Sequence, residues 1–198
     1  MRLTEKEDAI IVGSILGDGC LEHNGSHVRI RFEHGISQKE YLLWKYEQLK
    51  NIVAGPPMKV HAFHRKNQKF YDSLRFYTRS NEAFEKYSET FYKDKRKIIP
   101  KNISELLTHP LSLAVWFMDD GYKRNDCNAL RLSTDSFNKN EQEILSDILN
   151  RNFNISNKLH KKGKTWNIYI PQSSARRFVD IGKPYIIPEL KYKIALAP

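Results

Sequence analysis

The sequence predicts an α+β protein made of two related halves, each with the order helix, two strands, helix, two strands, helix. The first observation is a repeated segment. Residues 11–19 read IVGSILGDG and residues 113–121 read LAVWFMDDG, so both are apolar runs that end in an acid and a glycine. The second observation is that the same series of alternating and helical patterns follows each segment. We therefore expect halves at residues 1–97 and 98–198.

The first half has clear start and turn signals. Thr4 with Glu7 three residues later is a capping box, and it predicts a helix that runs into the first repeated segment. Asn24-Gly25 predicts a tight hairpin turn. Further strands are expected at 28–33, 58–65 and 71–79, helices at 37–51 and 81–91, and a basic linker at 93–97.

The second half repeats this order in a shorter form. After the second repeated segment we expect an irregular polar stretch, a strand at 129–133 and a helix at 138–153. A hairpin at 155–170, turning at Lys162-Gly163, and a helix at 173–181 follow. Gln38-Lys39 corresponds to Asn138-Lys139 in this alignment of the halves.

The composition is strongly basic, with a formal net charge of +10 and a pI of about 9.5. This balance is typical of nucleic-acid-binding proteins, although a membrane surface or an acidic partner would also fit it. The polar, acidic start argues against a signal peptide, and no apolar run reaches the roughly 20 residues that span a bilayer. We expect an intracellular protein without a membrane partner. Two cysteines make no zinc site, and a disulfide is not expected.

The expected strands carry basic and aromatic side chains on their outer faces. Such a face can lie on DNA, where strands enter the major groove and Arg reads guanine. The alternative is an ordinary solvated face of an antiparallel sheet. The candidates for DNA contact are Arg29, Arg31, Glu33, His61, Arg65, Arg75, Tyr77, Arg79, Arg131, Ser133, Lys158, His160, Asn167 and Tyr169.

The acids of the repeated segments are the candidates for chemistry. Asp18 and Asp120 occupy matching places 102 residues apart, each at the end of an apolar run. An apolar helix end has no use for a carboxylate unless that carboxylate is paired or binds metal. We expect metal ligation by both acids, helped by the backbone carbonyls of Gly17 and Asp119. The Asp119 side chain is a weaker candidate, because Gly17 stands at its matching place. Hard oxygen ligands favour Mg²⁺ or Ca²⁺.

The glycines of the two segments predict close helix packing and a particular backbone. Gly13 and Gly17 share one helix face, which lets another helix backbone approach. Gly19 and Gly121 follow the acids and are expected to end the helices with positive φ. The alternative is that Asp18 and Asp120 are helix-ending acids without a chemical role.

The two segments match the motif of the LAGLIDADG homing endonucleases, and the chain resembles the single-chain, two-motif members of that family over essentially its whole length. The resemblance implies a monomer with two αββαββα halves about a pseudo-twofold axis. Two antiparallel DNA-binding sheets and a central pair of motif helices complete that fold. It also implies cleavage of both strands of a long, asymmetric double-stranded DNA target with Mg²⁺, leaving cohesive ends, with Ca²⁺ supporting binding only. Lys97 and Lys193 resemble the active-site lysines of such members, the alternative being solvated lysines in basic runs.

Two other functions fit the same scaffold. One is an RNA maturase that assists splicing by binding its host intron RNA. The other is a DNA-binding protein that has lost its nuclease activity, against which the presence of both acids argues. Mitochondrial, chloroplast, bacterial and phage origins all fit the sequence.

Overall fold

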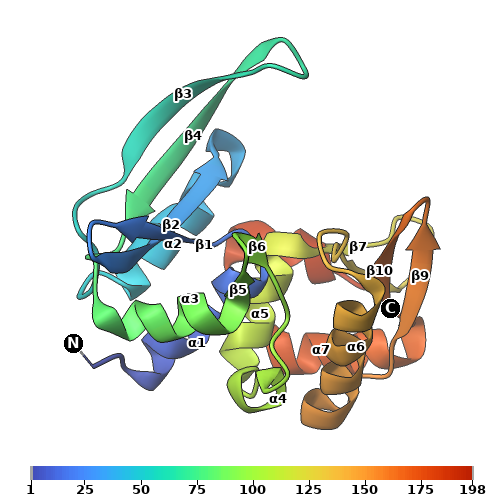
Figure 1. Cartoon of the computed structure of the whole chain (residues 1–198). Coiled ribbons are helices and arrows are strands. Elements are labelled where there is room, and N and C mark those ends of the chain that lie inside the picture. Colours follow the sequence, from blue (N-terminus) through green and yellow to red (C-terminus); the bar gives the residue numbers. More distant parts are fainter. Residues whose placement is uncertain (1, 198) are drawn as a thin grey trace.

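The computed structural model describes residues 2–197, and its elements follow the expected order (Figure 1). The helices are α1 (Glu5–Leu16), α2 (Lys39–Gln48), α3 (Glu85–Phe91), α4 (Ile103–Leu106), α5 (Pro110–Asp120), α6 (Lys139–Phe153) and α7 (Gln172–Gly182). Short 3₁₀ helices are η1 (Ile36–Gln38), η2 (Glu82–Phe84) and η3 (Pro188–Ile194). The strands are β1 (Cys20–Asn24), β2 (His27–Gly35), β3 (Met58–His64), β4 (Lys69–Tyr77), β5 (Tyr92–Lys93), β6 (Arg96–Lys97), β7 (Gly121–Lys123), β8 (Leu130–Leu132), β9 (Lys158–Lys162) and β10 (Thr165–Ile170).

Two antiparallel sheets repeat one strand order. The first sheet is β1-β2-β4-β3 and the second is β7-β8-β10-β9, and each takes its helices in the same sequence. The α+β class and the αββαββα pattern of both halves are therefore confirmed. Figure 1 shows the motif helices α1 and α5 side by side at the centre, with a sheet on either side of them. No helix within residues 2–197 combines the length and the apolar character needed to cross a membrane.

The capping box that the sequence predicts at the start of α1 is present. The Thr4 side chain accepts a hydrogen bond from the Glu7 amide at 3.2 Å, and the Glu7 carboxylate accepts one from the Thr4 amide at 2.8 Å. α1 then buries nearly its whole circumference, as α5 does, because the other half covers the side that would otherwise face solvent. These two helices form the core that joins the halves.

Gly13 is a point of close approach between α1 and α5. A Cβ at this position would lie against the carbonyl oxygen of Ser112 and 2.8 Å from Cβ of Val115. Backbone atoms on a packed helix cannot yield as a flexible side chain can. The absence of a side chain at Gly13 therefore sets the distance between the two motif helices.

Gly13→Ala is expected to destabilise the protein by about 1–3 kcal/mol, because overpacking forces the helices apart. The better helix propensity of Ala, about 1 kcal/mol, offsets only part of this loss. Thermal unfolding should show a melting temperature lower by about 2–10 °C. Gly55→Ala is the matched control, since a Cβ there meets nothing within 4 Å. A Gly13→Ala protein as stable as this control would contradict the packing argument.

Two backbone expectations are wrong. Gly19 and Gly121 do not have positive φ; in the described chain, the glycines that do are Gly25 and Gly163. Gly19 and Gly121 are instead needed for space, because a Cβ would meet the Ser14 carbonyl at 2.8 Å in one case and the Phe117 ring in the other. The basic stretch 93–97 is not an extended linker. It forms the β5–β6 hairpin, whose turn residues Asp94 and Lys95 take positive φ.

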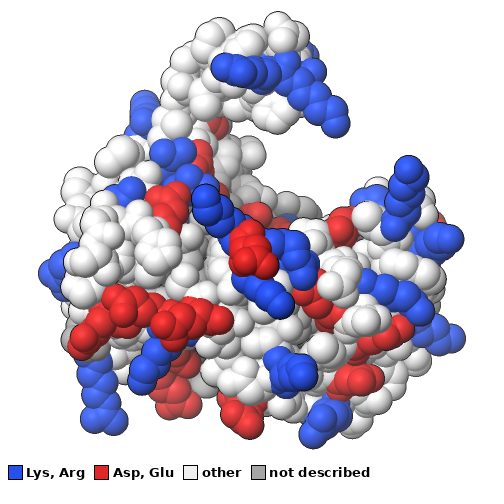
Figure 2. Space-filling model, in the orientation of Figure 1, with Lys and Arg blue, Asp and Glu red and all other residues white. Residues whose placement is uncertain are grey.

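The halves differ most in their second hairpin. β3 and β4 pair from Met58↔Arg75 to His64↔Lys69 and form a long arm that projects from the first sheet (Figure 1). β9 and β10 are shorter and stay close to their sheet. The molecule is consequently asymmetric on the side where the sheets lie. Figure 2 shows this side hollowed between the arm and the second half.

Candidate active site and nucleic-acid interface

The carboxyl ends of the two motif helices bring four predicted site residues together. Asp120 is the last residue of α5, whereas Asp18 lies two residues beyond the end of α1. Lys97 ends β6 and Lys193 lies in η3, and the charges of both lysines act on both acids. The four residues come from both halves, so the site exists only where the halves meet.

The lysines hold the helix ends. Lys97 Nζ donates to the carbonyl oxygens of Gly17 at 2.7 Å and Gly19 at 3.0 Å. Lys193 Nζ donates to the carbonyls of Met118 at 2.6 Å and Asp119 at 3.5 Å. Helix carboxyl ends carry partial negative charge, and a buried ammonium neutralises it. The carbonyls of Gly17 and Asp119 thus already bind lysines, and each has a second lone pair to offer a metal.

The electrostatics of the acids favour a cation between them. Burial, with the neighbouring Asp119 and Asp18 carboxylates, raises the pKa of Asp120 to about 8. Burial and the Asp119 carboxylate also raise the pKa of Asp18, although half of that side chain is exposed. Burial lowers the pKa of Lys97 and of Lys193, against the pull of the acids. Carboxylates that resist ionisation together are stabilised in their charged forms by a divalent cation.

Asp119 has a different environment from its neighbour Asp120. Its fully buried carboxylate accepts from Lys45 Nζ on α2, at 2.8 Å through Oδ1 and 3.1 Å through Oδ2. Oδ2 also accepts from the backbone N–H of Asp18 at 3.2 Å. The side chain that we considered a weaker metal ligand is therefore engaged in an ion pair between the halves.

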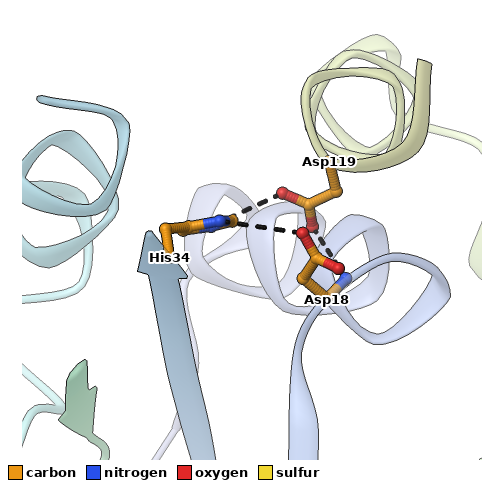
Figure 3. A group of neighbouring side chains, drawn as sticks. All are labelled: Asp18, His34 and Asp119. Atoms are coloured by element: carbon orange, nitrogen blue, oxygen red, sulfur yellow. Dashed lines mark hydrogen bonds and ion pairs between the residues drawn. The ribbon is translucent and has the colours of Figure 1, made fainter. Parts of the chain in front are cut away.

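His34 at the end of β2 completes this cluster (Figure 3). Its Nε2 lies 3.3 Å from Lys45 Nζ, and its Nδ1 lies 3.7 Å from Oδ2 of Asp18. Burial and the Lys45 charge lower the pKa of His34 to about 4, so the ring is neutral at physiological pH. With Nε2 accepting from Lys45, the remaining N–H points toward the Asp18 carboxylate.

Asp18, His34 and Asp119 are close enough together to suggest a metal site, but Lys45 argues against it. Their ligand atoms lie within 4.8 Å of one another. The Lys45 ammonium is in contact with Asp119 and His34 and occupies the place of a cation there. We assign the cluster a structural function beside Asp18. Sequence analysis missed Lys45 and His34, although one signal existed: Lys45 lies four residues from both Tyr41 and Leu49 in an otherwise apolar stripe.

The outer face of the first sheet carries an ordered basic network. Arg29 stacks over the Tyr77 ring at 3.9 Å, Arg31 pairs with Glu22 at 2.8 Å, and Arg75 pairs with Glu33 at 2.7 Å. Partial burial opposes the charge on Glu33, but bonds from Ser73 and Arg75 hold its pKa below the usual range. The strand register places these predicted residues on one face, as Arg31↔Tyr77 and Glu33↔Arg75 are direct partners. Glu22, which positions two arginines, was not predicted.

The second sheet carries a smaller version of this face. Tyr169 is paired with Arg131 on one side and Lys158 on the other, and the His160 ring stacks on it at 4.2 Å. Of the two further candidates, Asn167 is buried and Ser133 is half-buried. Asn167 is on the same face but only 1 % exposed, and the backbone N–H of Ser133 is bonded to the Asp120 carbonyl at 3.0 Å. The structure therefore argues against direct contact by Asn167 in this conformation.

Three candidates of the first half lie apart from the arginine network. His61 pairs with Asp72, and this register puts it on the face of Leu74, opposite to Arg75. Arg65 follows the end of β3, in the turn at the tip of the arm. Arg79 follows β4 and donates to the Asn51 carbonyl in the loop after α2. The residues on the arginine side of the arm are instead Val60, Ala62, His64, Lys69 and Tyr71.

The fold and this site define a duplicated α+β protein with a paired-acid centre between two basic sheets. Residues 8–178 match the model of the LAGLIDADG DNA endonuclease family, and the chain belongs to that family. A cytochrome b mRNA maturase, bI2 of Debaryomyces hansenii, is 32% identical, with 93% of this chain and 72% of that protein aligned. The DNA endonuclease I-ChuI of Chlamydomonas applanata is 29% identical over 98% of this chain and 97% of that protein. The structure of the homing endonuclease I-WcaI, bound to its DNA recognition sequence, superposes with a TM-score of 0.91 and 29% identity, covering 100% of this chain and 89% of that one.

Proposed function

We propose that this chain is a monomeric homing endonuclease that cuts both strands of a long, asymmetric double-stranded DNA target, with Mg²⁺. Its halves are residues 1–97 and 98–198. The observation that carries the proposal is the joint placement of Asp18, Asp120, Lys97 and Lys193 at the contact of the two halves. The basic faces of both sheets flank this centre, so DNA lying on them would bring its phosphates to the acids.

The donor set fits a hard divalent cation. Asp18 and Asp120 offer carboxylate oxygens, and the carbonyls of Gly17 and Asp119 offer further oxygens. When bound, Mg²⁺ would make a water nucleophilic and stabilise the leaving oxygen of a phosphodiester. Ca²⁺ has the same ligand preference, and we expect it to support DNA binding without cleavage.

The protein groups have separate tasks in this mechanism. The two carboxylates would hold the divalent cation beside the scissile phosphates. Lys97 and Lys193 fix the helix ends that carry the acids, and their ammonium charge offsets the repulsion between acids and phosphate. Arg29, Arg75 and Tyr77 in one half, and Arg131, Lys158 and Tyr169 in the other, would bind the duplex on either side.

The unequal hairpins predict unequal halves of the target. The β3–β4 arm would reach DNA farther from the cut than the β9–β10 hairpin can. Its outer positions include the apolar Val60 and Ala62, which suit contact with a thymine methyl group in the major groove. We propose that the first half contacts the longer half-site.

A cleavage assay on defined libraries tests the proposed activity. Partly randomised variants of the I-WcaI recognition sequence, ligated into plasmids, are incubated with the protein in Mg²⁺ or in Ca²⁺, and cut molecules are sequenced. Recovery of one long sequence cut in Mg²⁺ and only bound in Ca²⁺ supports the proposal. Binding of a long sequence in both ions without cutting in either would favour the DNA-binding protein without nuclease activity.

Metal affinity should depend on pH, because the metal binds the ionised form of Asp120. With its pKa raised to about 8, this carboxyl is protonated at neutral pH, and metal binding must release that proton. Apparent Mg²⁺ affinity should therefore fall about tenfold for each pH unit below 8. Calorimetric titration with Mg²⁺ between pH 6 and pH 9 measures this slope.

The same raised pKa affects the stability of the metal-free protein. The folded state holds the Asp120 proton more tightly than the unfolded chain does, so this contribution is full below about pH 4 and is lost as pH rises through about 8. Asp120→Asn should flatten this part of the melting profile. An affinity and a melting temperature that do not change over this range would contradict the assignment.

An RNA maturase function is a second proposal, and the maturase of Debaryomyces hansenii is the observation that favours it. The same scaffold would then bind structured intron RNA. A splicing assay with the intron that carries this reading frame distinguishes the two functions. Protein-dependent splicing that survives Asp18→Asn would show that the maturase activity does not use the acidic centre.

A further inference from the structure

The two acids of the centre are not held in the same way. The backbone N–H of Asp18 donates to Oδ2 of Asp119 at 3.2 Å, and the His34 ring lies beside the Asp18 carboxylate. Asp119 is itself fixed by Lys45, and all three supporting side chains are at most 2 % exposed. The main chain of Asp18 is thus held by one buried cluster, and its half-exposed side chain lies beside the His34 ring.

The second half lacks each member of this cluster. Gly17 stands at the place of Asp119, Thr134 at that of His34, and Leu145 at that of Lys45. The alignment holds in space, because Thr134 and Leu145 are fully buried as their counterparts are. Thr134 donates to Gln142 at 2.7 Å and offers no charge. Asp120 therefore has no counterpart of the side-chain acceptor that holds Asp18.

The asymmetry is built into the contact of the motif helices. A Cβ at Gly17 would lie 2.5 Å from Cβ of Asp119, so only glycine leaves room for this carboxylate. Lys45 crosses from α2 of the first half to reach it. Within residues 2–197, no other ammonium or guanidinium group bonds to the Asp119 carboxylate. In a symmetric protein, identical residues would stand at the matching positions 17 and 119. Here Gly17 faces Asp119, and Lys45 pairs with Asp119.

We infer that Asp119 and Lys45 are positioning residues for Asp18 alone, so that their loss impairs the cutting of one DNA strand and not of the other. The inference rests on the proposed function. The cleavage step that depends on Asp18 relies on this cluster, whereas Asp120 is held by its own helix α5 and by the bond from the Ser133 N–H to its carbonyl at 3.0 Å. A displacement of about 1 Å in a reacting group can cost a factor on the order of 100 in rate. Loss of the cluster should accordingly slow the cutting of the strand that depends on Asp18 more than the cutting of the other strand.

Two double variants isolate the hydrogen bond to Asp18. K45M/D119N removes both charges and keeps a side-chain oxygen that can accept from the Asp18 N–H. K45M/D119A removes both charges and that acceptor. Strand-specific rates are measured on a duplex carrying a different fluorophore on each strand. We expect K45M/D119A to slow one strand about tenfold or more, while K45M/D119N keeps the strand ratio close to that of the parent protein.

A merely structural effect would give a different result. Asn152→Ala, which removes bonds to the carbonyls of Ser104 and Leu107, loosens the packing of α6 on α4 and serves as the control. General loosening slows both strands alike. Equal slowing of both strands by K45M/D119A, or an equal strand bias in K45M/D119A and K45M/D119N, would overturn the inference.

A second measurement does not need cleavage at all. Hydrogen exchange of the Asp18 amide, followed by NMR, should be protected in the parent protein and in K45M/D119N. It should exchange about tenfold faster or more in K45M/D119A. If the parent protein cuts no duplex, the proposed function fails, and this exchange rate alone decides the positioning claim. An unchanged rate in K45M/D119A would overturn it.

Discussion

Asp18→Asn or Asp120→Asn is expected to abolish double-strand cleavage, with a loss of about a thousandfold or more in rate. A carboxylate that binds the catalytic cation contributes several kcal/mol of transition-state stabilisation, and each 1.4 kcal/mol is a factor of ten. DNA binding in Ca²⁺ should survive, because the substitution removes negative charge beside a phosphate backbone. Conversion of supercoiled plasmid to linear product measures cleavage, and gel shift in Ca²⁺ measures binding.

Asp147→Asn is the matched control for these variants. It makes the same chemical change on the exposed side of α6 and should leave cleavage and binding intact. Variants of Asp18 or Asp120 that still linearise plasmid at the parental rate would remove these residues from the mechanism. Loss of binding with the fold intact would assign the acids to DNA recognition.

Lys45→Met is expected to destabilise the protein by about 3–5 kcal/mol, the largest stability effect that we foresee. The substitution leaves the Asp119 carboxylate buried and without its cation, and an uncompensated buried charge is costly. For a chain of this length the melting temperature should fall by about 6–20 °C. Denaturant unfolding and calorimetry measure the change.

K45M/D119N should recover most of that loss, because both charges are gone and the cavity keeps its volume. Asp119→Asn alone leaves the ammonium unpaired and should also be destabilising. The coupling energy from this double-mutant cycle should be large. If K45M/D119N is as unstable as Lys45→Met, the loss comes from packing of the lysine stem and not from the charge pair.

Much of the fold could be predicted because its signals are local. The capping box at Thr4, the Asn24-Gly25 turn and the alternation at Val28 to Glu33 each depend on neighbours in sequence, and each appears in the structure. The repeated segment also predicted the meeting of Asp18 and Asp120. Because the motif is duplicated, a pattern that is local in sequence predicts a contact between two positions that are far apart in the chain.

The features that the sequence did not reveal depend on partners far away in the chain. Alternation in β3 was recognised, but the face that each residue takes is set by the register with β4. Most of β3 lies beyond the helices with both faces exposed, so burial left no pattern to place His61. Lys45 was missed for a related reason: its partner Asp119 lies 74 residues away in the other half. Lys45 and Asp119 do not occupy matching places in the repeat, so nothing in the sequence connects them.

The Lys45–Asp119 pair also restricts what each half can associate with. Two first halves pressed together along their motif helices would each enclose an ammonium facing Gly17. Two second halves would set Asp119 against Asp119, with no lysine from α6 because Leu145 stands there. Either assembly of two identical halves would bury unpaired like charges. A first half with a second half instead buries the neutral pair of Lys45 and Asp119. The charge pair therefore favours the association of a first half with a second half over a symmetric dimer of either half.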